Sequence, residues 1–531
     1  MLNQEIRNNI QDLWDRLWAG GLANPITAIE QISYLLFMKR LENFKPDIPN
    51  EYRWSTYSSY NDSDLAVHLK DRVFEYIKKD LANEEEPFAK AMKDSVFLIN
   101  TPTLIRDSIT YIDGVYSNIE RQEKENNQYF QDIQGDVYEY LLSNLSQAGK
   151  NGQFRTPRHI IQMMAEILNP DIDGKICDLA CGSGGFLVGS YIHIITKYSQ
   201  KKVKDDDGLP KGTDRKLLSK EQTKKLNEST FYGFDIDQTM VRIGMMNLMM
   251  HGITKPNIQH LDTLSLRYEE LEASRIGEKF DIENKESIVN ANIRGQYKYI
   301  LANPPFTGKI NSVTVSENLD RVYPLVLNKK TKKSERQKTV QSELLFLERM
   351  IYMLQDGGRA CVIVPEGLLF NTSIAHISTR RLLMNDCQLQ GVISLPGGVF
   401  QPYTGVKTSI LIFKKKQYKS EKSHTLDVWF YDMKSDGYSL DATRKKLKEK
   451  PLPTTVKEWN ERSSKDQNNR KLQNFNIPYS EIEKNNFDLT INKYKEFEYE
   501  SHEYRLPKYI LEELFELENE ILKGLDDIGS L

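Results

Sequence analysis

The chain has 531 residues, of which 39% are hydrophobic and 10% aromatic, and its formal net charge is −3. This composition excludes a disordered chain, and the length predicts two or three domains. No apolar run approaches the roughly 20 residues that a membrane-spanning helix needs. The four cysteines are few, and the absence of a signal peptide predicts a reduced, intracellular protein.

The near-neutral charge bears on nucleic-acid binding, because proteins that grip DNA unaided are usually basic. The balance leaves two alternatives: basic residues gathered on one face, or a partner that does most of the gripping. Cys177 and Cys181 lie close in sequence, but no neighbouring Cys or His completes a zinc set. Buried small hydrophobes are the favoured interpretation of these two residues, and no metal is expected.

Residues 1–150 form a predicted helical N-terminal domain. Apolar residues recur at helical spacing over 6–17 and again over 29–41. The dipeptide Gly20-Gly21 and Pro25 separate the two runs. A further helix is predicted over 137–145.

Residues 151–415 form a predicted α/β catalytic domain with a Rossmann-like, doubly wound and mostly parallel sheet. Short apolar runs alternate here with helical segments such as 239–250 and 343–354. In such sheets, ligands bind outside the carboxyl ends of the strands. The predicted strands are Ile176–Leu179, Phe231–Phe234, Ile258–Leu261, Tyr299–Ala302, Ala360–Val364, Leu389–Leu395 and Thr408–Phe413.

Residues 416–531 are predicted to be a polar linker followed by a helical tail. The tail helix, 509–525, carries a broad stripe of leucine and isoleucine. This stripe is either an intramolecular packing face or a docking face for a partner helix. Two charged segments within the catalytic domain, 201–225 and Lys329–Lys338, are interpreted as surface loops, and the second could contact phosphate.

A glycine-rich turn, Asp178–Phe186, follows directly on a predicted strand and leads into a predicted helix. Glycines allow a backbone to approach a ligand closely. The sequence differs from the dinucleotide-binding fingerprint, because it lacks the third glycine at the usual offset. By itself the turn is compatible with a nucleotide-like ligand or with a plain strand-to-helix connection.

Acidic residues follow the next two predicted strands. Asp235 ends one strand, where a carboxylate can accept hydrogen bonds from both hydroxyls of a ribose. Asp262 follows the next strand, in position to meet an adenine amine. Each alone could be a helix cap, but three acids at successive strand ends around one glycine turn favour a cofactor site.

The catalytic prediction depends on Asn303, Pro304, Pro305 and Phe306, which follow a predicted buried strand. The two prolines stiffen the turn. The Asn303 side-chain carbonyl and the Pro304 carbonyl can then accept from the two N–H bonds of one planar amine. Two such acceptors draw the lone pair out of conjugation and make the nitrogen nucleophilic, while Phe306 offers a face on which a base can stack.

These four elements resemble those of S-adenosylmethionine-dependent N6-adenine DNA methyltransferases, and more closely the modification subunit of type I restriction–modification systems. The resemblance extends over nearly the whole chain, including 152–158, 247–252, 391–396 and 432–438. Leu179 departs from the family, which commonly has proline there. The resemblance implies that Asn303, Pro304, Pro305 and Phe306 are catalytic. The implied cofactor-binding residues are Gln153, Phe154, Arg155, Thr156, Pro157, Arg158, Asp178, Ala180, Gly182, Ser183, Gly184, Gly185, Asp235 and Asp262.

The same resemblance implies the reaction and the partners. A methyl group would pass from S-adenosyl-L-methionine to the N6 amine of an adenine flipped out of double-stranded DNA. A separate specificity subunit would read the site, with two copies of this chain on each specificity subunit, and ATP-dependent restriction subunits could join. The implied location is the cytoplasm of a prokaryotic-type cell.

Two other functions remain compatible with the residues alone. The same quartet could methylate another planar amine, such as a glutamine side chain in protein or a guanine in RNA. The chain could also be an assembly subunit that binds DNA and partners without turnover, although an intact Asn303 quartet argues against this.

Overall fold

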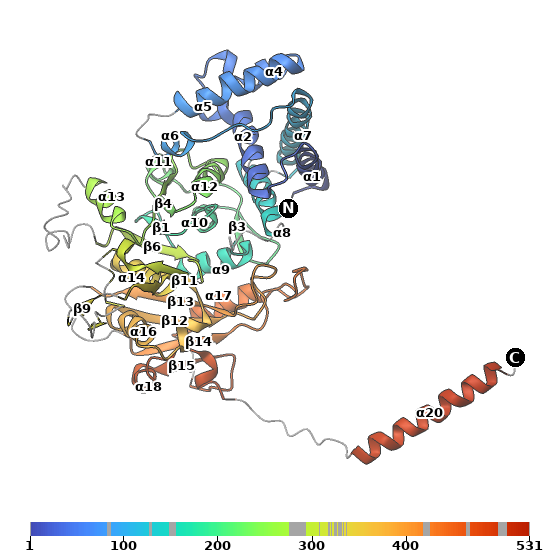
Figure 1. The fold of residues 1–531 in the computed structure, drawn as a ribbon, viewed down its shortest axis with the longest axis vertical. Helices are drawn as coiled ribbons and strands as arrows, with labels where there is room; N and C mark the ends of the chain where they lie inside the picture. The colour runs from blue at the N-terminus through green and yellow to red at the C-terminus, as the bar shows by residue number, and fades with distance from the viewer. Residues whose placement is uncertain are drawn as a thin grey trace. The chain divides into compact units, whose positions relative to one another are not determined.

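The structure is a computed structural model, in which 2–81, 86–126, 130–147, 155–275, 294–306, 308–316, 319, 321–322, 326–327, 332, 334–335, 337–417, 425–463, 468–496 and 507–529 are described. The chain divides into two compact units, Met1–Tyr494 and Lys495–Leu531. The first unit holds a sheet with helices on both faces (Figure 1). The predicted α/β fold class is therefore confirmed.

One nine-stranded sheet organises the first unit, with the strand order β15-β14-β12-β13-β11-β6-β1-β4-β5. The strands from β5 to β11 are parallel to their neighbours, and β13 runs antiparallel between β11 and β12. The strands are β1 (Ile176–Asp178), β4 (Phe231–Asp235), β5 (Asn257–His260), β6 (Tyr297–Ala302), β11 (Leu354–Pro365), β12 (Cys387–Ser394), β13 (Thr408–Lys415), β14 (Asp427–Asp432) and β15 (Asn474–Pro478). Each predicted strand has its counterpart among them.

Alternate side chains of the central strands enter two separate hydrophobic cores, one on each face of the sheet. In β11, Cys361 and Ile363 enter one core, and Ala360, Val362 and Val364 enter the other. The first core includes residues of α9 (Arg158–Leu168), α10 (Gly185–Lys197), α12 (Gln238–Met250) and α17 (Pro451–Glu461). The second includes residues of α13 (Arg267–Arg275), α14 (Ser342–Met353), α16 (Ile374–Asp386), α18 (Tyr479–Lys484) and α19 (Ile491–Tyr494).

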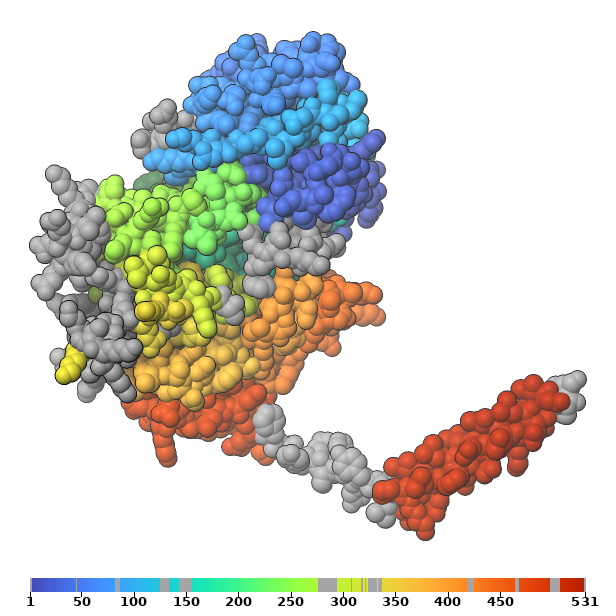
Figure 2. Space-filling view, in the orientation of Figure 1, coloured from blue at the N-terminus to red at the C-terminus, as the bar shows by residue number. Residues whose placement is uncertain are grey.

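The N-terminal region is helical as far as Gln147, as the apolar spacing predicts. Its helices are α1 (Gln4–Ala19), α2 (Pro25–Phe44), α3 (Trp54–Tyr57), α4 (Asp62–His68), α5 (Glu75–Lys79), α6 (Pro87–Met92), α7 (Pro102–Asn126) and α8 (Phe130–Gln147). Residues of these helices belong to the first core, and α2, α6 and α8 contact α12. In the space-filling view, the blue N-terminal residues lie directly against the green residues of the sheet region (Figure 2).

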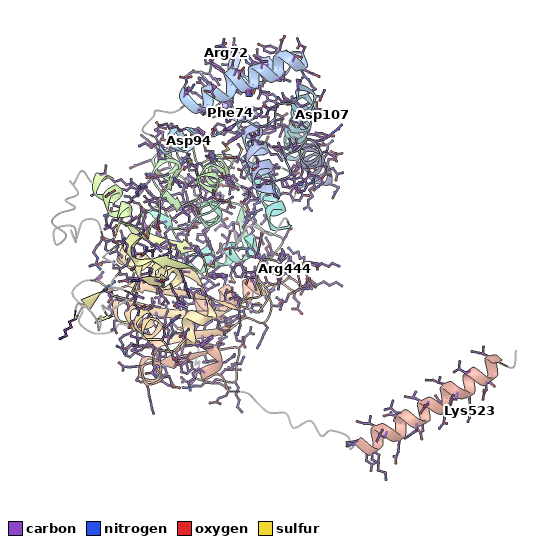
Figure 3. All side chains as sticks on the ribbon, in the orientation of Figure 1. Arg72, Phe74, Asp94, Asp107, Arg444 and Lys523 are labelled. Carbon is purple, nitrogen blue, oxygen red and sulfur yellow. The ribbon has the colours of Figure 1, made fainter. Side chains whose placement is uncertain are left out.

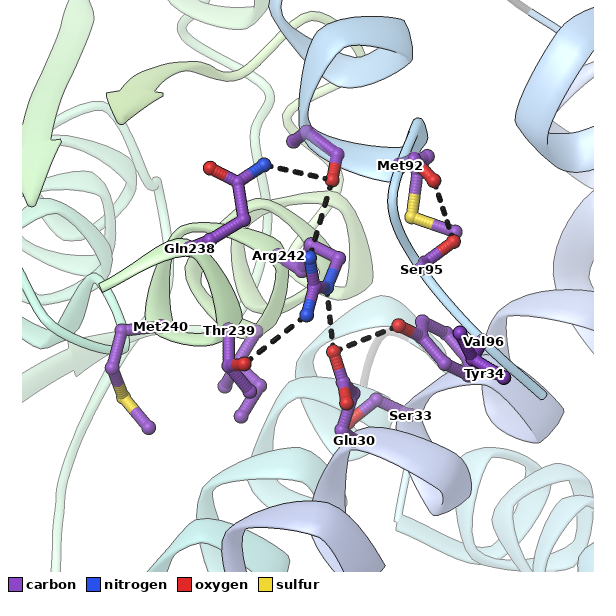
Figure 4. Close-up of polar contacts among 12 residues, drawn as sticks. Glu30, Ser33, Tyr34, Met92, Ser95, Val96, Gln238, Thr239, Met240 and Arg242 are labelled. Atoms are coloured by element: carbon purple, nitrogen blue, oxygen red, sulfur yellow. Dashed lines mark hydrogen bonds and ion pairs between the residues drawn. The ribbon is translucent and has the colours of Figure 1, made fainter. Parts of the chain in front are cut away.

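A buried ion pair joins this helical region to the sheet region. The Arg242 guanidinium of α12 donates to Glu30 of α2 at 2.5 Å, and the Tyr34 hydroxyl donates to the same carboxylate at 2.8 Å (Figure 4). Gln238 also donates to the Ala91 carbonyl of α6. Removing one partner of a buried pair costs more than the pair itself contributes, so this contact fixes how α2 and α12 meet.

Strand directions bring distant parts of the chain to one edge of the sheet. Since β1, β4, β6 and β11 are parallel, Asp178, Asp235 and Asn303 all lie at or just beyond their carboxyl ends. The strand β14 runs parallel to β12 and in the same sense as β11, so the segment after Asp432 starts at this edge too. We call this the catalytic edge.

Part of the region assigned to the linker takes part in the sheet. β14 and β15 lie beyond residue 415 but pair with β12 and with each other. Trp459 of α17 is buried, and its indole N–H donates to the Ile167 carbonyl at 3.1 Å. The predicted boundaries at 150 and 415 stay predictions, but 427–478 contributes to the core of the first unit.

The second unit contains α20 (Pro507–Gly529), which covers the predicted tail helix. Its large apolar side chains are between 47% and 70% exposed, and Figure 3 labels Lys523 on this helix. The segment 201–225 is not a plain loop, because it forms the hairpin β2 (Lys202–Lys204) and β3 (Pro210–Gly212) and begins α11 (Lys220–Glu228). Half of Lys329–Lys338 lies outside the described residues, and within the other half Ser334–Glu335 forms the short strand β9. Among the described helices, none is long and apolar enough to cross a membrane.

Candidate active site at the catalytic edge

The glycine-rich turn connects β1 to α10 in a conformation that requires its glycines. Gly182 and Gly184 have φ values of 50° and 78°, a region that side chains disfavour. A Cβ on Gly184 would lie 2.7 Å from Leu248, whereas one on Gly182 would meet nothing within 4 Å. The close packing under Gly184 and the open space over Gly182 fit a turn that a ligand approaches from above.

Asp178 is a buried carboxyl at the start of this turn. One of its oxygens accepts from the Ala180 backbone N–H at 3.2 Å, and its side chain is 1% exposed. Burial, with a smaller contribution from the nearby Asp235 carboxylate, raises the pKa of Asp178 to about 8. A cationic ligand beside it would favour the ionised form, so the position fits a positively charged group.

Asp235 holds the turn from the neighbouring strand. Its two oxygens accept from the Gly182 and Asp237 backbone N–H groups, at 2.8 and 2.9 Å. Burial raises its pKa, although these backbone donors oppose the shift. Each carboxylate oxygen can accept a second bond, so ribose binding by Asp235 stays a prediction. Asp262 is exposed and accepts from the Leu264 N–H at 2.9 Å within a turn, and its role toward adenine also stays a prediction.

The nitrogen and the oxygen of the Asn303 side-chain amide differ in their contacts. Its amide nitrogen donates to the Thr156 hydroxyl oxygen at 2.9 Å. Its amide oxygen is buried and has no hydrogen-bond partner among the described residues. An unpaired buried acceptor costs free energy, so its presence at the end of a strand indicates a ligand group that donates a hydrogen bond.

The rest of the quartet is less open than the sequence analysis expects. Pro304 is buried and Pro305 is exposed. Phe306 is 5% exposed, and its ring packs edge-on against Phe400, with centroids 5.5 Å apart at 89°. In this arrangement the Phe306 ring presents little free face, so base stacking on it requires the two rings to separate. Phe400 is an aromatic residue of this site that the sequence analysis missed.

Two ion pairs join α8 to the first residue of α9 and to the segment just before it. Arg155 pairs with Glu139, and Arg158 donates to Asp136 at 2.6 Å. Burial alone would raise the pKa of Glu139, but Arg155 and Arg158 lower it below its ordinary value. We call the predicted cofactor-binding residues Gln153–Arg158 the closing segment, of which Gln153 and Phe154 lie outside the described residues. Pro157 is the N-cap residue of α9.

Glu139 is also linked to the glycine turn, through the side chain of Asn247. The Asn247 side-chain amide donates to Glu139 at 3.2 Å and to the Ser183 carbonyl at 2.8 Å. Asn247 belongs to a segment that carries the family resemblance, but nothing in the sequence indicates that Glu139 lies near it. A residue of the helical region therefore supports both the closing segment and the turn.

A hydrogen bond to the segment after β14 also holds α9. The His159 imidazole contacts Asp436 at 2.9 Å, and Arg444, labelled in Figure 3, pairs with the same carboxylate. Burial would raise the pKa of Asp436, but His159 and Arg444 lower it. The His159 ring also stacks on Tyr438, with centroids 4.3 Å apart. The segment after β14 is thus fastened next to Thr156.

The acidic side chains of the catalytic edge can lie beside an organic cation. Among the described residues, no group of three or more His, Cys, Asp or Glu could hold a metal ion, and the four cysteines are buried and free. S-adenosylmethionine carries a sulfonium and an ammonium group. The buried Asp178 carboxyl, the open space over Gly182 and the strand-end Asp235 therefore fit this molecule.

Comparison with known proteins gives a consistent family. The model of the N-6 DNA methylase family matches residues 129–503. The chain is 27% identical over 509 residues to the type I restriction enzyme EcoEI methylase subunit of Escherichia coli, covering 91% of this chain and 89% of that protein. It is 25% identical to the EcoKI methylase subunit of Escherichia coli K12, covering 82% of this chain and 72% of that protein.

Solved structures agree on the fold. A chain from a type I restriction–modification system studied for its assembly and conformational transition superposes with a TM-score of 0.63 at 21% identity, covering 99% of this chain and 98% of that one. The methyltransferase subunit of a type I system from Streptococcus thermophilus gives 0.57 at 16% identity, covering 93% and 100%. The family match confirms the predictions of an adenine-specific DNA methyltransferase and of S-adenosylmethionine as methyl donor. The chain belongs to the N-6 DNA methylase family.

Proposed function

We propose that this chain methylates the N6 amine of an adenine flipped out of double-stranded DNA, as the modification subunit of a type I restriction–modification complex. The observation that carries the catalytic part is the buried amide oxygen of Asn303 at the catalytic edge, which has no hydrogen-bond partner among the described residues. A base still stacked in the duplex cannot reach this buried oxygen, so flipping is required, at a cost of about a few kcal/mol.

The chain contributes to the reaction mainly by holding groups in place. Asn303 accepts a hydrogen bond from the amine, and the Pro304 carbonyl is proposed as the second acceptor. The amine lone pair then leaves conjugation and is free to form the new N–C bond. The bond between the methyl carbon and sulfur would break with its electron pair left on sulfur, and the methylated nitrogen would then release one proton to solvent. S-adenosylmethionine supplies, when bound, a methyl group on a positively charged sulfur. We assign its binding to Asp178, the turn residues Gly182–Gly185 and Asp235, with the closing-segment residues Gln153–Arg155, Pro157 and Arg158.

The aromatic pair must rearrange to admit the base. Separation of Phe306 from Phe400 would expose a ring face for stacking. Stacking of a base on an aromatic side chain contributes roughly 1–3 kcal/mol, which offsets part of the flipping cost.

The surface of α20 supports the assembly part of the proposal. Its exposed apolar side chains recur at spacings of three and four residues, as in helices that pack along another helix. The stripe comprises Ile510, Leu514, Leu517, Ile521, Leu525 and Ile528. We propose that α20 docks on a helix of a specificity subunit, which reads the DNA site. Two copies of this chain on each specificity subunit, and association with ATP-dependent restriction subunits, belong to the same proposal, as does a cytoplasmic location.

The acceptor test separates this function from its alternatives. The complex with its specificity subunit is incubated with methyl-labelled S-adenosylmethionine and with separate DNA, RNA and protein acceptors. Label in DNA is expected. Label only in protein or RNA would favour another planar amine, and no label in any acceptor would favour an assembly subunit without turnover.

A further inference from the structure

The hydroxyl of Thr156 makes a side-chain contact with the catalytic amide. Thr156 comes before α9 and is 5% exposed, and its oxygen lies 2.9 Å from the Asn303 amide nitrogen. The two residues are 147 positions apart in sequence. The family resemblance implies a cofactor contact for Thr156, which stays a prediction, and the structure shows a contact of its hydroxyl with Asn303.

The contact with Thr156 favours one of the two orientations of the Asn303 side-chain amide. With the Asn303 nitrogen donating to Thr156, the amide oxygen is the atom left to accept from a ligand. The reversed amide would turn its NH₂ group toward the incoming amine, so that donors would face donors. An orientation that places the oxygen toward the amine is therefore required for the proposed activation.

The backbone around Thr156 is held on both sides. Arg155 and Arg158 pair with Glu139 and Asp136 of α8, and His159 contacts Asp436. A hydroxyl on a segment fixed by two ion pairs and a hydrogen bond is a preorganised acceptor for its partner. The position of the Thr156 oxygen is thus set by contacts with α8 and with the segment after β14.

We propose that Thr156 is a positioning residue, which holds the Asn303 amide with its oxygen toward the adenine amine. The inference rests on the proposed methyl transfer and names one further residue that this reaction needs. It differs from a cofactor contact, because its loss should slow the chemical step without weakening cofactor binding.

The test compares Thr156→Val, which keeps the shape but removes the hydroxyl, with Thr156→Ser, which keeps the hydroxyl. Both are measured in the complex with the specificity subunit. Thr156→Val is expected to lower kcat for DNA methylation by about tenfold, the contribution of one buried hydrogen bond. The Kd for S-adenosylmethionine, measured by direct titration, should stay within twofold, and Thr156→Ser should restore kcat to within about threefold of the parent.

A second comparison tests whether Thr156 acts through Asn303. In a chain carrying Asn303→Ala, adding Thr156→Val should change the residual single-turnover rate by less than twofold. If Thr156→Val does not fold, Thr156→Ala replaces it in both comparisons.

Three results would overturn the inference: a raised Kd for S-adenosylmethionine with kcat intact, a Thr156→Ser variant as slow as Thr156→Val, or a full additional loss in the Asn303→Ala chain. Failure of the proposed function itself would look different, because the parent complex would then leave DNA unmethylated.

Discussion

The catalytic edge and α20 differ in the exposure and polarity of their functional side chains. At the catalytic edge, Asp178 and Thr156 are buried and Asn303 and Asp235 are partly buried. Other residues of the same unit hold the last two, because Thr156 accepts from Asn303 and Gly182 donates to Asp235. On α20, the functional surface is apolar and exposed, with Leu514 and Leu517 more than half exposed. The first unit thus holds its own catalytic groups in place, whereas we propose that a partner buries the exposed stripe. Substitutions can disrupt the catalytic edge and the α20 stripe independently.

The largest effect is expected from removing the catalytic amide. Asn303→Ala deletes the acceptor that activates the amine and should lower kcat for DNA methylation by about 10²–10³-fold. Binding of the specificity subunit, measured by size-exclusion chromatography, should be unchanged. The exposed Asn8 of α1 gives a matched control, since Asn8→Ala should leave both measurements within twofold. A chain without Asn303 that still methylated DNA at the parent rate would refute the catalytic assignment.

The converse effect is expected on α20. Leu514→Glu with Leu517→Glu places charges in the apolar stripe and should weaken binding of the specificity subunit by about 100-fold, because helix docking depends on burying these side chains. The Kd for S-adenosylmethionine should not change. Glu516→Gln with Glu520→Gln alters charge on the same helix and serves as the control. Unaltered assembly in the leucine variant would show that the stripe does not dock this partner.

The smallest effect concerns the buried carboxyl at the glycine turn. Asp178 has a pKa of about 8, above its ordinary value. Between about pH 4 and 8 the folded chain holds a proton that the unfolded chain has lost. The free energy of unfolding without ligand should therefore fall as pH rises through this window.

Binding of a cationic cofactor requires that proton to leave. The affinity for S-adenosylmethionine should consequently rise with pH between 6 and 8, by up to about tenfold per pH unit. Calorimetric titrations across this range measure it. Asp178→Asn should flatten the profile, while Asp206→Asn, a change at an exposed acid, should keep it. A parent profile that does not vary with pH would contradict the assignment of Asp178 to the cation.

Features formed by residues close together in the sequence could be predicted from it. Buried parallel strands are short apolar runs, so β1, β4 and β6 could be located from local composition. The glycine turn and the Asn303 quartet are contiguous motifs directly after those strands. The catalytic edge could be assembled because parallel strands end together.

The features that the sequence left hidden are contacts between distant residues. Glu139 supports both Arg155 and Asn247, Asp436 holds His159, and Phe400 packs on Phe306. None of these pairs shares a local pattern, and each depends on the packing of separate elements. The strands β14 and β15 were missed for a related reason, because the polar stretches around them resemble a linker.

The identity of the methylated base tests the central claim most directly. DNA treated with the complex and labelled S-adenosylmethionine is digested to nucleosides, which are separated and identified by mass spectrometry. All label is expected in N6-methyldeoxyadenosine, at a level that falls by about 10²–10³-fold with Asn303→Ala. Label in a methylated cytosine, or N6-methyldeoxyadenosine that persists undiminished with Asn303→Ala, would contradict it.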